Sequence, residues 1–255
     1  MFEPAWFLAF WGALAVLAVL EALIPECLTQ ADRGRRWPTN FGFAIVNGLI
    51  ASLFPALTVG ATQWAASHGL GFLNWIAVPW WPALFITIII ESLALFVFHL
   101  CAHANPILWR LHRVHHSDVH VDVTSTFRHH PLELLAMLLI LVPIYVIVGL
   151  SPIAVASYEI VANVFGLLTH ANLRITAKTE RMLRLLFVTP LFHRVHHSAF
   201  QAETDSNYGD VFSFWDRLFG TYCSEPRTPI SVGLENVDRE LAGDFVVQLK
   251  SPWRA

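Results

Sequence analysis

The chain alternates between long apolar runs and short polar segments, and the apolar runs are long enough to cross a bilayer. A membrane-spanning helix needs about 20 mainly apolar residues. Five runs meet this requirement when a turn at Ser67–Val78 divides the longest of them, and they are Ala5–Ile24, Phe41–Ala66, Pro79–Leu100, Leu132–Leu150 and Pro152–Asn172. The pattern predicts an all-α integral membrane protein with four to five transmembrane helices. Re-entrant hairpins in place of some passes remain an alternative.

Composition narrows the class of protein further. Hydrophobic residues make up 55% of the 255 residues and charged residues only 14%, whereas an ordinary soluble domain has about 25% charged residues. These values exclude a soluble domain and an intrinsically disordered chain. The net charge of -3 argues against a nucleic-acid partner. Three scattered cysteines do not suggest a disulfide framework.

The positive charges predict how the chain is oriented in its membrane. All 16 Lys and Arg residues follow the first pass, lie between the third and fourth passes, or follow the fifth. These segments share one side of a five-pass protein, and the positive-inside rule makes that side cytoplasmic. We therefore expect the N-terminus outside and the C-terminus inside, with a helical cap on the cytoplasmic side. A bacterial inner membrane is the expected location.

Histidine is the unusual residue of this chain. Many of the 13 histidines fall in one HxxxH and two HxxHH stretches, and these are His99, His103, His112, His115, His116, His193, His196 and His197. The spacing of three and four places each set on one helix face. Imidazole is a common ligand of Fe, Zn, Cu and Ni, and a structural zinc takes only four ligands. With His130 and His170 added, ten ligands suit two ions with five each.

The surroundings of these histidines resemble those of a known superfamily. The segments concerned are Leu108–Ser117, Thr124–Glu133, Thr189–Ser198, Asn207–Gly209 and Trp215–Thr221. They are similar to the histidine boxes and closing signature of the membrane fatty acid hydroxylase and sterol desaturase superfamily. The resemblance covers about half of the chain. It implies N-terminal transmembrane helices over residues 1–90, a catalytic region over residues 91–222 and a cytoplasmic tail over residues 223–255.

The resemblance also implies an activity. Its members are oxidoreductases, and the chain is expected to be a di-iron monooxygenase of lipid biosynthesis with O2 as co-substrate. It would hydroxylate or desaturate a C–H bond of a sterol, fatty acyl chain, sphingolipid or related lipid. Neutral nitrogen ligands suit iron, although zinc and manganese remain open. Because no nicotinamide or flavin fingerprint is present, electrons are expected from a ferredoxin, a cytochrome or a reductase.

Two adjacent histidines, His129 and His130, stand directly before Pro131. Pro131 disfavours the α conformation for His130, and successive side chains of an extended segment face opposite ways. Only one of His129 and His130 is therefore expected to face the metal. The similarity of Arg128–Glu133 to an R-x-H-P-x-E segment selects His130 as that ligand.

Polar residues inside the spans are further candidates. Carboxylates often orient the histidines that bind a metal, and an ionisable group within a span is a functional candidate by default. Glu91 lies eight residues before His99, and Glu159 lies eleven before His170 with Asn163 on the same side. We expect Glu91, Glu159 and Asn163 to support catalysis from beside the ligands. The alternative is that the two glutamates pair with buried Asn, Ser or Tyr.

Two other functions use membrane-embedded histidines. A transporter of divalent metals places its ligands within crossing spans near the middle of the bilayer, whereas most histidines here lie at or beyond the inner ends. A di-haem electron carrier needs single histidines on facing helices, which HxxHH does not supply. The pattern favours the oxygenase over both.

Overall fold

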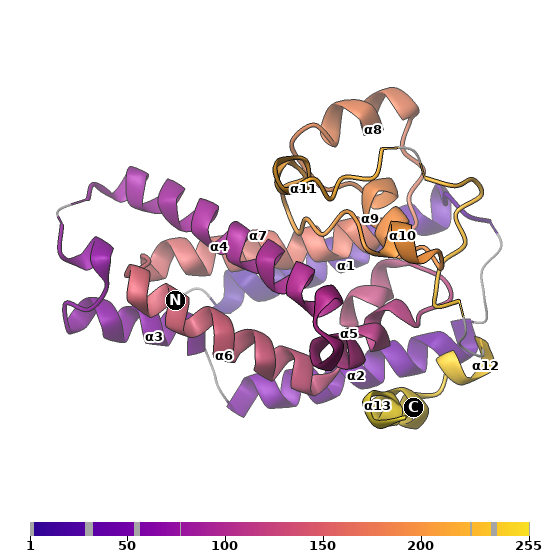
Figure 1. Cartoon of the computed structure of the whole chain (residues 1–255), viewed down its shortest axis with the longest axis horizontal. Helices are drawn as coiled ribbons and strands as arrows, with labels where there is room; N and C mark the ends of the chain where they lie inside the picture. The colour runs from indigo at the N-terminus through magenta and orange to yellow at the C-terminus, as the bar shows by residue number, and fades with distance from the viewer. Residues whose placement is uncertain are drawn as a thin grey trace.

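A computed structural model describes residues 3–28, 33–53, 57–76, 78–224, 226–235 and 239–254. The regular elements over these residues are helices (Figure 1). The longer ones are α1 (Glu3–Leu23), α2 (Arg33–Leu53), α3 (Leu57–Ser67), α4 (Trp80–Ala104), α6 (Pro131–Val148) and α7 (Pro152–His170). The all-α prediction is confirmed.

Short helices gather at one end of the long ones. They are α5 (Pro106–His116), α8 (Ala177–Leu183), α9 (Pro190–His196), α10 (Gln201–Thr204), α11 (Phe214–Phe219), α12 (Arg239–Ala242) and α13 (Phe245–Lys250), with 3-10 turns η2 (Val123–Phe127) and η3 (Ser251–Trp253). A further 3-10 turn, η1 (Phe72–Asn74), lies elsewhere. In Figure 1, α8 to α11 lie above this end and α12 and α13 below it, while η1 is at the opposite end near α3. The expected helical cap is therefore present.

Four stretches are long and apolar enough to cross a membrane, and they are Arg33–Ser67, Trp80–Ala104, Pro131–Val148 and Pro152–His170. A shorter apolar helix covers Leu8–Leu23. The outer surface of the bundle exposes many large apolar side chains, for example Leu139, which is 77% exposed. Such a surface suits lipid rather than water. The single pass expected at Phe41–Ala66 is formed by α2 and α3, and residues 54–56 between them lie outside the described residues.

Helix α7 is the centre of the bundle. It packs against α1, α3, α4, α9 and η2. Val155 and Leu167 are fully buried at opposite ends of α7, in two different apolar clusters. Because burial of such side chains contributes about 1.5–3 kcal/mol each, α7 is held firmly. His170, its last residue, is therefore carried to a defined position under the cap.

A buried ion-pair network ties α2 to the segment that follows α5. Arg36 of α2 donates hydrogen bonds to Asp118 at 2.5 Å and to Asp122 at 2.9 Å. Arg128 donates to the carbonyl of Val114 at 3.0 Å and to Ser117 Oγ at 2.9 Å. Burial alone would raise the pKa of Asp118, but the guanidinium groups of Arg36 and Arg128 hold it well below its usual range. The network fixes the chain directly after the first HxxHH.

Candidate metal centre

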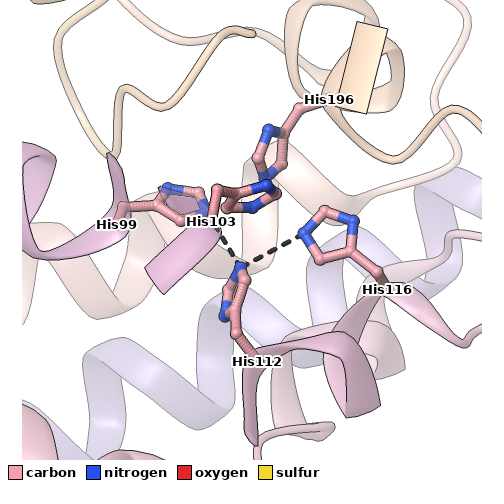
Figure 2. A group of neighbouring side chains, drawn as sticks. All are labelled: His99, His103, His112, His116 and His196. Carbon is pink, nitrogen blue, oxygen red and sulfur yellow. Dashed lines mark hydrogen bonds between the residues drawn. The ribbon is translucent and has the colours of Figure 1, made fainter. Parts of the chain in front are cut away.

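Five histidines from three helices form the first cluster, which we call group A. Its members are His99 and His103 of α4, His112 and His116 of α5, and His196 of α9. One potential ligand atom of each lies within 4.8 Å of those of the others. Figure 2 shows the five rings turned toward one another from separate ribbons. The Nε2 atom of His112 lies 3.1 Å from that of His99 and 3.1 Å from that of His116.

Four more histidines form a second cluster, group B. They are His115 of α5, His170 of α7, His193 of α9 and His197, which directly follows α9. Three of the spacings between Nε2 atoms are short, and they are His115 to His170 at 3.1 Å, His170 to His193 at 3.0 Å and His193 to His197 at 3.2 Å. Each HxxHH motif contributes histidines to both groups, so the two groups are neighbours. The rings of His116 and His197 stack with centroids 4.6 Å apart.

The local sequence explains how the two HxxHH helices begin. Asn105 caps α5 by accepting hydrogen bonds from Ile107 N and Leu108 N, and Thr189 caps α9 by accepting from Phe192 N. Each cap residue is followed by a proline at the first helical position. Proline suits this position because a backbone N–H there would have no hydrogen-bond partner within the helix. The caps set the start of each helix. The histidines then occupy the last turns, facing α4 and α7.

The outer nitrogens of several rings are held by oxygen acceptors. His99, His170 and His196 donate from Nδ1 to the carbonyls of Tyr208 at 2.8 Å, Gly166 at 2.6 Å and Ser206 at 2.7 Å. His112 and His103 face the carboxylates of Glu133 at 2.7 Å and Asp205 at 3.2 Å. A proton donated from Nδ1 leaves a lone pair on Nε2. This arrangement orients imidazoles that bind metals.

The charge state of the histidines suits ligation. Burial lowers the pKa of His115, His116, His193, His196 and His197 well below the ordinary value of histidine, and the neighbouring imidazoles lower it further. These rings are therefore neutral at pH 7, and a neutral imidazole is the form that binds a metal.

The residues of both groups fit a metal ion. Two ligands that meet one ion at right angles with bonds of about 2.1 Å are about 3 Å apart, which matches the short Nε2 spacings in both groups. The Nε2 atoms of His103 and His196 are buried without a hydrogen-bond partner. A buried nitrogen left unsatisfied costs about 1–3 kcal/mol, and an ion would satisfy it. Nitrogen donors alone are compatible with iron, zinc or manganese.

The structure reverses the expectation for His129 and His130. As expected, only one ring faces the clusters, but it is His129, which stacks on His115 with centroids 4.3 Å apart. His130 caps α6 by accepting from Leu132 N, and its Nε2 donates to the carbonyl of Leu249 at 3.1 Å. The expectation that His130 faces the metal groups is therefore wrong. The C-terminal segment holds His130 away from them.

The intramembrane candidates also lie elsewhere than expected. Glu91 accepts a hydrogen bond from the Tyr145 hydroxyl at 3.1 Å, which is the alternative pairing with a buried tyrosine. Asn163 is exposed on the bundle surface and donates to the carbonyl of Glu159 in its own helix. None of the three contacts a histidine of either group through a described hydrogen bond. A shared helix face does not bring residues together when two or three turns separate them.

The carboxylates that do reach the histidines are Glu133 and Asp205. Glu133 Oε1 accepts from His112 at 2.7 Å and lies 3.3 Å from His129 Nδ1. The sequence carries a signal for this residue, because Glu133 follows His129 by four positions at the start of an apolar helix. No comparable signal marks Asp205, which is 102 positions from His103.

Residues 84–221, more than half of the chain, match the family model described as fatty acid hydroxylase. The ornithine lipid hydroxylase OlsE of Rhizobium tropici is 31% identical over 97% of this chain and 76% of its own length. Alkylglycerol monooxygenases of Danio rerio and Homo sapiens are 30% and 28% identical over 58% of this chain. The match spans only 31% and 32% of those two proteins. No solved structure matches the chain.

Proposed function

Because the chain belongs to the fatty acid hydroxylase family and is an oxidoreductase, we propose that it holds two iron ions in groups A and B and hydroxylates a C–H bond of a membrane lipid. The observation that carries this proposal is the pair of adjacent all-histidine groups at the end of an apolar helix bundle. Bound iron supplies the oxidising power for O2 chemistry that no side chain provides.

Hydroxylation is favoured over desaturation. The relatives that this chain matches include a lipid hydroxylase and alkylglycerol monooxygenases. In this reaction one oxygen atom of O2 enters the C–H bond, and the other is reduced to water with two electrons and two protons. The electrons are proposed to come from an external donor, a ferredoxin, a cytochrome or a reductase, at the cytoplasmic face. Residues 91–222 are the proposed catalytic region.

The chain itself contributes orientation and exclusion of water. The carbonyls of Tyr208, Ser206 and Gly166 hold Nδ1 protons, so that Nε2 of each ring points inward. His116, His196 and His197 are fully buried, which keeps bulk water away from the metal groups. The apolar helices below the groups suit a substrate whose tail stays in the bilayer.

The location of the site is part of the proposal. The 16 positive charges support a cytoplasmic metal centre and C-terminus and an outside N-terminus. The bacterial source of the relative OlsE supports a bacterial inner membrane as the location. A reporter fused after Gly71 is expected outside, and one fused after Ala255 inside. Both reporters on the same side would contradict this orientation, although not the metal centre.

The test of function is lipid analysis in cells that lack the gene and cells that express it. Expression is expected to create lipid species heavier by one oxygen atom. His196→Ala removes a group A nitrogen and should abolish these species. His68→Ala, which removes an exposed histidine that bonds only within its own region, should retain them. Species lighter by two hydrogens would show desaturation instead, and an unchanged lipid profile would contradict the proposal.

A further inference from the structure

One surface of the cap is apolar although it lies outside the four membrane-spanning stretches. It is formed by α8 with the residues that follow it and by α11 with the residues that precede it, and we call residues 177–187 and 212–219 the platform. Six large apolar side chains of the platform are exposed, and they are Met182, Leu183, Leu185, Leu186, Leu218 and Phe219. An exposed apolar patch of this kind marks a surface that interacts with something outside the chain.

Hydrogen bonds and a ring contact join the two parts of the platform. Ser213 donates from its backbone N–H to the carbonyl of Leu186 at 3.0 Å and from its hydroxyl to the carbonyl of Arg184 at 2.8 Å. The rings of Phe187 and Phe212 stack with their centroids 5.9 Å apart. The exposed apolar side chains of both parts are therefore carried by one ordered unit.

The platform packs against α4 at a depth that lies within the bilayer. Trp215 of α11 donates a hydrogen bond to Ser92 Oγ at 3.2 Å, and the ring of Phe219 stacks on that of Phe96 with centroids 5.3 Å apart. Phe96 precedes the end of α4 by eight residues, which is about 12 Å along a helix. Helix α4 is only about 8 Å longer than the hydrocarbon core is thick. Phe96 therefore lies inside the core even if all of this excess is at the histidine end.

A contact with α7 gives the same depth. The ring of Phe187 lies 5.6 Å from that of Phe165, centroid to centroid, and Phe165 precedes the end of α7 by five residues. In Figure 1, α8 and α11 lie to one side of the bundle, next to α4 and α7. Leu185 and Leu218 are 68% and 69% exposed, so they point away from these helices. At this depth the medium around the bundle is lipid.

The charges of the platform fit lipid head groups. Its basic residues are Lys178, Arg181, Arg184 and Arg217, whereas its acidic residues Glu180 and Asp216 are buried. No ion pair among the described residues includes a basic residue of the platform. Basic residues beside exposed apolar ones are typical of helices that lie in a membrane interface, because the phosphates and anionic head groups there are negative.

We propose that the platform inserts its apolar side chains into the leaflet on the side of the histidine groups and that Arg181 and Arg184 bind the phosphates of its phospholipids. A second copy of this chain would cover the apolar side chains but would leave the basic residues without negative partners. The proposal also places His99 of group A, about 5 Å further along α4 than Phe96, near the level of the head groups. It does not depend on bound metal or on the proposed reaction.

The experiment identifies the neighbours of the platform by photocrosslinking. Leu185 or Leu218 is replaced by benzoylphenylalanine in the full-length chain, and the purified protein is placed in vesicles of three parts phosphatidylcholine and one part phosphatidylglycerol. Both changes are at exposed positions, and an unchanged melting temperature verifies the fold. Mass spectrometry after illumination should find phospholipid adducts at both positions. Ala202, an exposed residue of α10 outside the platform, is the matched control and should give far fewer.

The role of the basic residues has its own measurement in the same vesicles. Phosphatidylglycerol should be over-represented among the adducts at Leu218, relative to its share of the vesicle, by at least about twofold. The double variant Arg181→Gln/Arg184→Gln should lose most of this preference while the lipid adducts themselves remain. Arg227→Gln, a change at an exposed arginine outside the platform, should keep it. An unchanged preference in the double variant would overturn the phosphate contacts.

Three results would overturn the insertion. Adducts between two copies of the chain in place of lipid adducts would assign the platform to a dimer. An absence of lipid adducts at both positions, or equal amounts at Ala202, would show that the platform faces water. A protein adduct in place of lipid in illuminated membranes of expressing cells would assign it to a protein partner. A platform that inserts in a chain that leaves cellular lipids unoxidised would contradict the proposed function alone.

Discussion

The imidazole rings of His115 and His129 lie parallel, with their centroids 4.3 Å apart and their planes 14° apart. His115 belongs to group B, while His129 belongs to neither group and lies beside Glu133. His129 therefore supports the ring of His115 in group B by stacking on it. Glu133, which lies beside His129, also accepts a hydrogen bond from His112 of group A.

This relationship predicts different outcomes for two adjacent substitutions. His129→Ala removes the support of His115 and should lower activity by about 10–100-fold, as changes to such supporting residues do. His130→Ala should keep most activity and lose the α6 cap, worth about 1 kcal/mol, together with the hydrogen bond to the Leu249 carbonyl. The measurement is product formed in membranes per amount of protein. An inactive His130→Ala beside an active His129→Ala would restore the assignment made from the sequence.

The pair also shows where sequence reasoning reaches its limit. Proline at 131 correctly indicated that the two rings diverge. The choice between them depends on contacts of His130 with Leu249 and Trp253, which are more than a hundred positions away. Eight of the nine histidines of groups A and B could be selected from spacing because three- and four-residue steps share a helix face, whereas His170 was added only to complete a set of ten ligands. Glu91 lies eight residues before His99, which is about 12 Å along α4, so a place on the same helix does not bring its carboxylate to the histidine groups.

Glu133 gives a second prediction. Glu133→Gln keeps the size of the side chain but removes the charge that holds the His112 and His129 protons. Metal affinity is expected to fall by about 10–100-fold. The measurement is metal retained per chain after dialysis against a graded series of chelator concentrations, with Glu240→Gln as the control. Identical retention by all three proteins would contradict a positioning role for Glu133.

The Arg36 network predicts a stability effect. Arg36→Met leaves Asp118 and Asp122 buried without their main cation, which should cost about 3–5 kcal/mol of unfolding free energy. Thermal unfolding in detergent measures this change. The double variant Arg36→Met/Asp118→Asn should recover part of the loss, because one unpaired charge is removed. A single variant that melts with the wild type would show that the network is not a stabilising element.

The stability of the metal-free protein is expected to depend on pH. Burial lowers the pKa of His115, His116, His193, His196 and His197 in the folded state, whereas the unfolded chain titrates near about 6.5. Below that pH the unfolded state binds more protons, so stability falls as pH decreases and is retained above it. Thermal unfolding of chelated protein at a series of pH values from 8 to 5 tests this. A melting temperature that rises on acidification would contradict neutral buried histidines.

The central claim is that two adjacent histidine groups each hold one metal ion, and metal content per chain tests it most directly. Protein expressed with iron and purified without chelator should contain about two irons per chain, on the ligand count. His196→Ala alters only group A and His193→Ala only group B, so each variant should lose about one iron, while His68→Ala should keep both. A wild type with at most one iron per chain, or two variants that keep the full wild-type content, would contradict the account.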